Sequence, residues 1–343
     1  MKKNRTSLIL TIVLVVIAVY FLFFKDSFST LGQKDNDFAV SDTAAITKIF
    51  MADKNNRSVT LTRVGVGQWM VNNKYKVRSD AINTLLFTIK MVSVKDVIDP
   101  RGVQNVINSL SSGAIKVEIY QGDKRVKLYY VGGPTAEQTG TFMLLANPNS
   151  GENFRQPYIT YIPGFEGYLT TRYFLPEDNW RDRTIYQYYP YALRSVNVTY
   201  PQSDSGFQIN VMGRNRFSLN NSAGQTVAAF DTIAVKQYIT YYQSVSWEVT
   251  AESRKRDSIL NALPIAVITV KDTTGKTTEV KLFNKKASGD AVSKYGKDYK
   301  YDPDQMYALV NGKDFVLVQY FIFGKMLQKF TYFTHPIRKS VEK

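Results

Sequence analysis

The sequence of 343 residues contains no cysteine and one histidine, His335. The absence of cysteine excludes disulfides, thiolate metal ligands and cysteine nucleophiles. A Ser-His-Asp triad or a site with several histidine ligands would have to be built around that single imidazole. The sequence also lacks a GxxxxGK(S/T) motif, an HExxH motif and a GxGxxG motif after a strand. We therefore expect no enzyme activity, no catalytic or metal-binding residues and no cofactor.

Acidic residues are scarce relative to basic ones. Lysine and arginine total 44 against 29 aspartate and glutamate residues, which gives a formal net charge of +15. An excess of positive charge favours anionic partners such as nucleic acid, anionic lipid or acidic glycan. The basic residues are scattered, however, and form no long run of like charges. We interpret them as a solvated basic surface and predict no nucleic-acid partner.

The first 26 residues predict a membrane anchor. Thr6–Phe24 is an uncharged run of 19 residues, which as a helix would span about 28 Å, close to the hydrocarbon thickness of a bilayer. A cleaved signal peptide is the alternative, but its apolar core is shorter, about 7–15 residues. Lys2, Lys3 and Arg5 place the N-terminus in the cytoplasm under the positive-inside rule. We predict a single-pass protein of the bacterial inner membrane, with a stalk at 27–37 and the bulk of the chain in the periplasm.

The rest of the chain contains one pattern twice. The alternating apolar and polar segment Trp69–Asn73 matches Phe217–Asn221 at an offset of 148 residues. Farther along, Val126–Tyr129 matches Val280–Phe283 at an offset of 154, each in a predicted hairpin. The predicted hairpin turns are Gly122-Asp123 and Asp272–Gly275. A repeated order with a drifting offset indicates a duplicated domain with insertions in its loops.

A helix is predicted between the two strand segments of each copy. Ile82, Leu85, Leu86 and Ile89 have the spacing 0, 3, 4, 7 of one helical face, and the segment from Val235 to Tyr242 repeats that spacing. The predicted caps are Ser79-Asp80 and Asp231-Thr232.

These elements predict an α+β fold. One helix can cover only one face of an antiparallel sheet. We expect two duplicated modules, each an antiparallel twisted sheet with one packed helix, after an N-terminal transmembrane helix. The predicted parts are 1–26 (cytoplasmic tip and anchor), 27–37 (stalk), 38–175 (first module), 176–192 (linker), 193–334 (second module) and 335–343 (basic tail).

Three features carry a family resemblance. They are the N-terminal anchor, the W-x-V-N segment Trp69–Asn72 before a capped helix, and the D-N-W-R-D-R stretch Asp178–Arg183 before the second copy. Over about residues 38–330 the chain resembles the bacterial envelope family called domain of unknown function 4340. The resemblance implies association with auxiliary components of ABC-type transporters, including those linked to gliding motility. It implies no catalytic residues.

The linker contains the densest cluster of polar and aromatic residues. Trp180 could stack on a sugar ring while Arg181 and Arg183 hold an anion, which makes these three residues candidates for an interaction site. The alternative is structural: Trp180 is buried between the modules and Asp182 pairs with an arginine.

A basic, aromatic loop after the second hairpin supplies three more candidate interaction residues, Lys294, Lys297 and Tyr299. The loop could contact lipid head groups or an acidic polymer. It could also be a solvated flexible loop, since Asp290 and Asp298 offset part of its charge.

Asp302 and Asp304 are the nearest approach to a pair of catalytic carboxylates. Glycoside hydrolysis needs two carboxyl groups about 5–9.5 Å apart across a cleft. Because these two flank Pro303, a turn that begins the next segment is the alternative interpretation.

Three functional hypotheses follow. The first is a membrane-anchored extracytoplasmic binding or scaffold protein, an accessory subunit of an envelope transporter or secretion complex. The second is a carboxylate-dependent enzyme acting on cell-wall glycan, and the third is a lipid-binding envelope protein. We favour the first, because duplicated sheets without converging titratable groups suit an interaction surface. Its expected partners are the membrane and an envelope protein complex, with glycan or lipid as further candidates.

Overall fold

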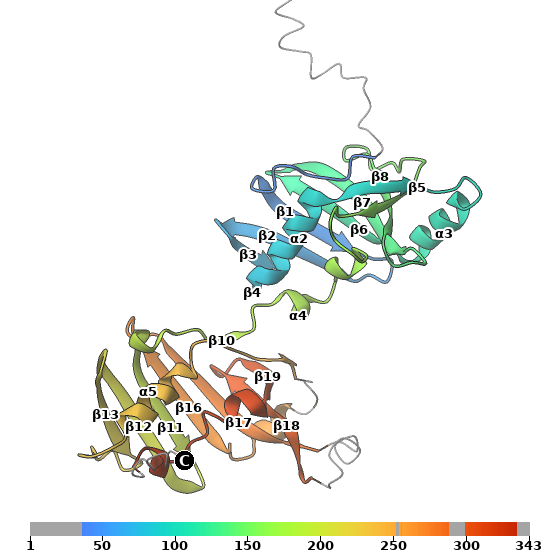
Figure 1. The fold of residues 1–343 in the computed structure, drawn as a ribbon. Helices are drawn as coiled ribbons and strands as arrows, with labels where there is room; N and C mark the ends of the chain where they lie inside the picture. The colour runs from blue at the N-terminus through green and yellow to red at the C-terminus, as the bar shows by residue number, and fades with distance from the viewer. Residues whose placement is uncertain (1–35, 252–253, 255, 288–298, 335–343) are drawn as a thin grey trace, which may run out of the picture. The chain divides into compact units, whose positions relative to one another are not determined.

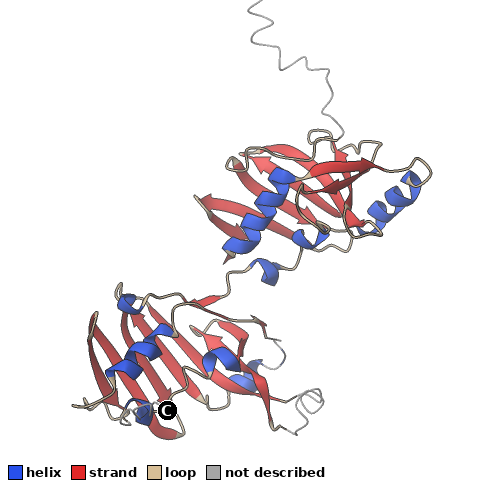
Figure 2. Cartoon of the chain, in the orientation of Figure 1, coloured by secondary structure: helices blue, strands red, loops and turns tan. Residues whose placement is uncertain are grey.

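The computed structural model describes residues 36–251, 254, 256–287 and 299–334. It divides into two compact units, Met1–Asp182 and Arg183–Lys343. The fold is mixed α+β and rich in strands, and the strand pairs of both large sheets are antiparallel (Figures 1 and 2). Among the described residues, none of the helices has the length and apolar character to cross a membrane. The predicted anchor, Thr6–Phe24, and the predicted basic tail lie outside the described residues.

The first unit is built on a nine-stranded sheet with the order β4-β3-β2-β1-β6-β7-β8-β9-β5. Its strands are β1 (Ile46–Ala52), β2 (Ser58–Gly65), β3 (Gln68–Val71), β4 (Tyr75–Lys76), β5 (Ser93–Val97), β6 (Ile115–Gln121), β7 (Lys124–Pro134), β8 (Thr141–Ala146) and β9 (Tyr158–Tyr161). Its helices are α2 (Ser79–Met91), α3 (Val103–Gly113), the 3-10 helix η1 (Thr170–Arg172) and α4 (Glu177–Trp180).

The second unit contains an eight-stranded sheet with the order β13-β12-β11-β16-β17-β18-β19-β15, and a separate pair of short strands, β10 and β14. Its strands are β10 (Thr184–Tyr186), β11 (Leu193–Tyr200), β12 (Ser203–Gly213), β13 (Arg216–Asn221), β14 (Val245–Ser246), β15 (Val249–Thr250), β16 (Ala266–Asp272), β17 (Thr277–Lys286), β18 (Tyr301–Val310) and β19 (Asp314–Gln319). Its helices are η2 (Pro190–Ala192), α5 (Thr232–Thr240), α6 (Arg256–Leu260), α8 (Tyr320–Phe323) and η4 (Phe330–Phe333).

The eight strands of the second sheet have counterparts in the same order in the first. In the first sheet the consecutive strands β1 to β3 lie on one side of the central pairing of β1 with β6, and the consecutive strands β6 to β9 lie on the other. In the second sheet β11 to β13 and β16 to β19 have the same arrangement around the pairing of β11 with β16. In each unit a short strand between the long helix and the next helix forms the far edge of the sheet, where β5 pairs with β9 and β15 pairs with β19. The short strand β4 extends the first sheet beyond this shared order.

The register confirms the match of 148 residues between the two copies. Val71 lies opposite Leu61 in the first sheet, and Leu219 lies opposite Ile209 in the second. All four side chains are fully buried. The two segments therefore occupy the same place in their sheets and point to the same side.

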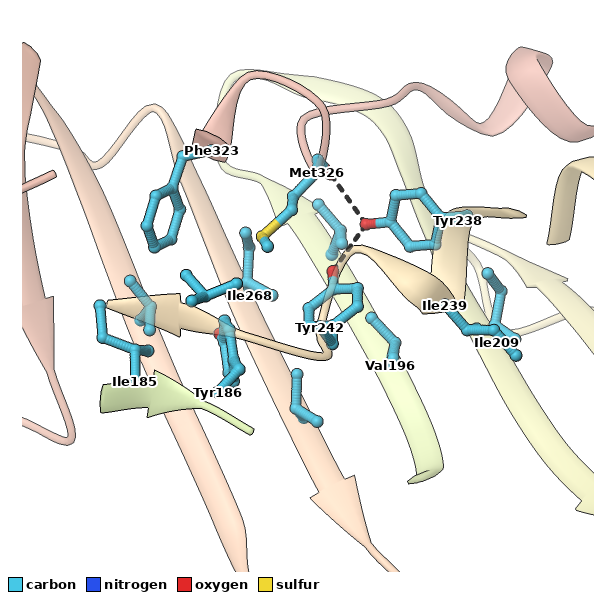
Figure 3. Packing of buried hydrophobic residues seen from close by; sticks show 14 of the residues in the cluster. Ile185, Tyr186, Val196, Ile209, Tyr238, Ile239, Tyr242, Ile268, Phe323 and Met326 are labelled. Carbon is cyan, nitrogen blue, oxygen red and sulfur yellow. Dashed lines mark hydrogen bonds between the residues drawn. The ribbon is translucent and has the colours of Figure 1, made fainter. Parts of the chain in front are cut away.

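One face of each sheet is covered by the predicted helix and forms the main core. In the first unit Ile82, Leu85 and Ile89 of α2 pack into this core. In the second unit Val235 and Tyr238 of α5 do the same, together with Tyr242 just after the helix. Figure 3 shows this packing around Tyr238 and Tyr242, whose hydroxyl groups are 2.8 Å apart. The residues that the helical spacing singled out in the sequence thus form the side of each helix that packs into the core.

The predicted caps differ in outcome. Asp231 caps α5, because its carboxylate accepts hydrogen bonds from the N–H groups of Ile233 and Ala234 at 2.8 and 3.0 Å. Ser79 and Asp80 do not cap α2; they are its first two residues, and Arg78 is the cap position. The predicted turns at Gly122-Asp123 and at 272–275 are confirmed.

The prediction of one helix per module is wrong, because a second helix lies on the opposite face of each sheet. In the first unit Leu110 and Ala114 pack on Leu144 in a separate small cluster. In the second unit Ile259 and Leu260 pack on a cluster that contains Phe283. Because side chains alternate along a strand, residues next to main-core positions point to this second face, which we call the open face.

Candidate functional site: a groove on each open face

The open face of the first unit contains a groove of about 550 Å³ beside α3. Its floor is formed by Phe50, Tyr130 and Leu144 from three strands, and α3 contributes Leu110 and Ser111 to one wall. The floor strands are interior strands of the sheet, so their backbone N–H and C=O groups are used in pairing on both sides. We call this cavity the α3 groove.

Two lysines stand at the α3 groove, Lys54 and Lys116. Lys54 is exposed, in the turn after β1. Lys116 is held by the Glu118 carboxylate, 2.7 Å away, and Arg125 contacts the same carboxylate at 3.1 Å. The neighbouring carboxylate of Asp53 is engaged by Arg57 at 2.6 Å. The two carboxylates beside the groove are therefore ion-paired, and the two lysines and two arginines around them leave a net positive charge.

Glu118 fixes the position of this charge. Burial by itself would raise the pKa of Glu118, but hydrogen bonds from Lys116 and from the Tyr120 hydroxyl outweigh burial, so the pKa lies below its ordinary value. The carboxylate is consequently ionised at neutral pH and keeps the Lys116 ammonium beside the groove.

The second unit has a groove of about 860 Å³ beside α6. Phe283, Tyr301 and Tyr307 line it from β17 and β18, and Ser258 and Ile259 line it from α6. β17 and β18 are interior strands paired on both sides. We call this cavity the α6 groove.

The α6 groove also carries two lysines, Lys285 and Lys286. Lys285 forms a short ion pair with Asp302, which holds its ammonium group in place. Lys286 is exposed. The α6 groove therefore repeats the combination found in the α3 groove, namely one ion-paired lysine and one exposed lysine beside an apolar floor.

The two grooves lie between corresponding elements. Each is bounded by the turn after the first long strand, by the second helix, and by the hairpin and following strand on the open face. From that turn, Asp53 and Lys54 line the groove of the first unit, and Gln202 lines the groove of the second. Ala114 and Ile265, each beside the strand that follows the second helix, line the corresponding wall. The grooves are thus a repeated feature of the fold.

The carboxylates that resembled a catalytic pair line another pocket of the second unit, with Glu248. Asp302 accepts hydrogen bonds from the N–H groups of Asp304 and Gln305 at 2.8 and 3.0 Å, which forms a tight turn at the start of β18. Burial would raise the pKa of Asp302, but Lys285 and these two N–H groups together lower it. The Asp302 carboxyl therefore carries no proton to donate at neutral pH.

The linker candidates Trp180 and Arg181 belong to the first unit. Trp180 is fully buried in the main core, stacked on Phe174 with ring centres 4.1 Å apart, and its indole N–H donates to the Phe174 carbonyl at 2.9 Å. Arg181 is 7% exposed and lies over the Tyr75 ring at 3.7 Å. The Trp180 indole therefore offers no surface for a sugar.

Backbone contacts explain the burial of this linker segment. The N–H of Arg78 donates to the Trp180 carbonyl at 2.8 Å, and the N–H of Asp182 donates to the Lys76 carbonyl at 2.7 Å. The Asp182 carboxylate also lies 3.0 Å from the Lys76 ammonium. The segment is thus attached beside β4, at the edge of the first sheet.

The remaining candidates lie in the second unit. Arg183 donates to the Glu248 carbonyl at 2.7 Å and lies over the Trp247 ring at 5.2 Å, which makes it a half-buried structural contact. Tyr299 is half-buried beside β18. Lys294 and Lys297 lie outside the described residues, as does His335. In the described part of the chain, no group of three or more His, Cys, Asp and Glu side chains is arranged to hold a metal ion.

Sequence reasoning missed both grooves, although part of the signal was present. The spacing 0, 3, 4, 7 that identified α2 also occurs in α3, at Val103, Val106, Ile107 and Leu110.

Comparisons with protein-family models, with curated proteins and with solved structures each gave no match to this chain.

Proposed function

We propose that this chain is a membrane-anchored extracytoplasmic binding protein that serves an envelope transporter or secretion complex as an accessory or scaffold subunit. The two units are copies of one ancestral module. The periplasmic placement and the anchor follow from the uncharged run Thr6–Phe24 and its flanking basic residues. The resemblance to domain of unknown function 4340 supports the link to a transporter.

The observation that carries the binding function is the repetition of the groove. Main-core side chains must be apolar in any copy that folds, but nothing in the packing of the core requires an open cavity on the other face. Both units nevertheless have a groove between the same elements, with an apolar floor and an ion-paired lysine. Cavities of this size that combine apolar walls with a few polar groups are typical of binding sites.

Affinity purification from native membranes tests this function. The full chain is compared with the double variant Ser111→Trp, Ser258→Trp, which fills both grooves from exposed positions on α3 and α6. The control is Ser112→Trp with Asn261→Trp, at exposed neighbouring positions that do not line the grooves. We expect the same envelope proteins to co-purify with the wild type and the control, and to be lost from the groove-filled variant.

Three results would contradict the proposal. The first is the recovery of identical proteins with the groove-filled variant and the wild type. The second is recovery of the full chain in the soluble fraction, and the third is resistance of residues 38–334 to protease added outside the inner membrane in spheroplasts.

A further inference from the structure

We propose that each groove binds one acyl chain that carries an anionic head group, with the chain along the apolar floor and the head group at the lysines. This inference rests on the proposed function in one respect, namely that the two grooves are the binding sites of the protein. It adds that their ligand is an anionic lipid.

The first argument is the match between the groove and an acyl chain. The floor of the α3 groove is formed by Phe50, Tyr130 and Leu144, with Leu110 above it. Phe283, Tyr307 and Ile259 provide the same apolar and aromatic surface in the α6 groove. Volumes of about 550 and 860 Å³ fall within the range of about 300–1,000 Å³ that holds small ligands. An acyl chain can cover such a floor without leaving polar groups buried.

The second argument distinguishes a lipid from a peptide. A peptide that enters a groove brings N–H and C=O groups that need partners when they are buried. The floor strands β1, β7 and β8, like β17 and β18, already have neighbouring strands on both sides, so they offer no edge strand for strand addition. A hydrocarbon chain makes no such demand, and the observations therefore favour the lipid.

The third argument is charge. Lys116 and Lys285 are fixed by Glu118 and Asp302, so their ammonium groups stay beside the grooves. The exposed Lys54 and Lys286 add one positive charge at each groove. An anionic head group complements this rim, whereas a cationic head group would meet like charge.

The predicted anchor supplies a source of lipid for the first unit. Phe38 is buried in the main core, and Lys127 donates to the Asp37 carbonyl at 2.7 Å, so the unit begins directly after the predicted stalk. Eleven extended residues at 27–37 reach at most about 36–40 Å. The proposed anchor would therefore keep the start of the first unit within about 40 Å of the bilayer surface.

Native mass spectrometry of the full chain, released from a neutral maltoside detergent, counts bound lipids directly. The probes are a lysophosphatidylglycerol with a 14-carbon chain and a lysophosphatidylcholine with the same chain. We expect up to two molecules of the anionic probe per chain, bound about tenfold more tightly than the zwitterionic probe. Ser111→Trp and Ser258→Trp should each remove one molecule, and the control pair Ser112→Trp, Asn261→Trp should remove none.

Charge variants provide a second test. Lys54→Glu and Lys286→Glu are exposed substitutions, and together they should weaken the anionic probe about tenfold and leave the zwitterionic probe unchanged. Hydrogen exchange verifies that each variant remains folded.

The proposal is overturned if the anionic probe does not bind, if both probes bind equally, or if the groove-filled variant retains two molecules. An absence of lipid binding combined with groove-dependent capture of envelope proteins would mean that the grooves bind protein, and the proposed function would stand. Lipid binding without such capture would leave the ligand assignment intact and remove the scaffold function.

Discussion

The open faces of the two units use corresponding positions for different side chains. In the first unit Lys48 and Phe50 lie beside Tyr120 and Glu118, and the Lys48 ammonium stands 3.9 Å from the centre of the Tyr120 ring. The corresponding pairs in the second unit are Ser195 with Lys271 and Asn197 with Thr269.

In the second unit the neighbouring strand, β12, also carries neutral polar side chains on the open face. Asn197 lies opposite Gln208 and Ser195 lies opposite Asn210, and the Gln208 amide donates to Asn210 at 2.7 Å. Over β11 and β12 the open face of the second unit therefore carries mainly neutral amides and hydroxyls, whereas β1 and β6 of the first unit carry charges and aromatic rings.

The covered faces, in contrast, remain apolar in both units. Met51 and Val198, which occupy corresponding positions in β1 and β11, are both fully buried. A polar side chain there would be buried without partners, whereas water satisfies polar groups on the open face. The core therefore restricts one face of each sheet to apolar side chains, and the other face is free to diverge in chemistry.

The largest expected effect on stability is alkaline unfolding. In the described part of the chain, burial raises the pKa of five fully buried tyrosine hydroxyls above the ordinary value of about 10, and that of Tyr173 to about 12. The unfolded chain then releases these protons first, so the free energy of unfolding decreases as pH rises from about 10 to about 12.

The two units should differ in this response. Tyr129 and Tyr173 are the fully buried tyrosines of the first unit, and Tyr186, Tyr238 and Tyr242 are those of the second. Hydrogen exchange of the full chain at pH 9 and pH 11, read from peptides of each unit, should show the larger loss of protection in the second unit. An equal loss in both units would contradict the prediction.

Trp180→Ala should destabilise the first unit by about 3–5 kcal/mol, because it removes a fully buried indole and leaves a cavity beside Phe174. Phe321→Ala is the control in the second unit, since Phe321 is 76% exposed and should change stability by less than about 0.5 kcal/mol. Denaturant unfolding monitored by hydrogen exchange separates the units. A loss below about 1 kcal/mol for Trp180→Ala would mean that the indole is not in the core.

The contrast between the faces can be tested on neighbouring residues of β1. Met51→Asn places an amide on the covered face, where Met51 is fully buried, and should cost about 2–4 kcal/mol. Phe50→Asn gives the open face the residue that the second unit carries at Asn197, and should cost about 1 kcal/mol or less. Equal costs, measured as shifts of the denaturation midpoint, would show that the open face is not exposed to water.

The smallest effects concern single hydroxyl groups in the second core. The Tyr238 hydroxyl donates to the Met326 carbonyl and contacts the Tyr242 hydroxyl, both at 2.8 Å (Figure 3). Tyr238→Phe should therefore cost about 1–2 kcal/mol. The hydroxyl of Tyr186 is buried and has no hydrogen-bond partner among the described residues, so Tyr186→Phe should be neutral or slightly stabilising. Thermal unfolding of both variants tests the order, and the reverse order would contradict it.

The sequence could predict the elements whose periodicity is long and regular. The buried stripe of α2 and the register of Val71 and Leu219 were readable because apolar side chains must face the core. The spacing of Val103, Val106, Ile107 and Leu110 was readable in the same way, but α6, with five residues, is too short to show a period.

The hairpin match shows where sequence alignment fails. An offset of 154 pairs Tyr129 with Phe283, but Tyr129 lies in the main core and Phe283 lies on the open face. The register instead matches Tyr129, opposite Val117, with Val280, opposite Ile268, at an offset of 151. A shift of three residues reverses the side to which every side chain points, since strands have a period of two. Sequence similarity alone did not detect this shift.

The repeated order of strands and long helices follows from the amino-acid sequence, because each of these elements needs its own apolar stripe. The sequence left open whether Trp180 is exposed or buried, and it did not reveal the grooves. Both the burial of Trp180 and the grooves depend on contacts between segments that are distant in the sequence, so they follow from the folded structure. Trp180 is buried where the linker meets the edge of the first sheet at Lys76 and Arg78. The grooves exist where the second helix of each unit lies beside the open face.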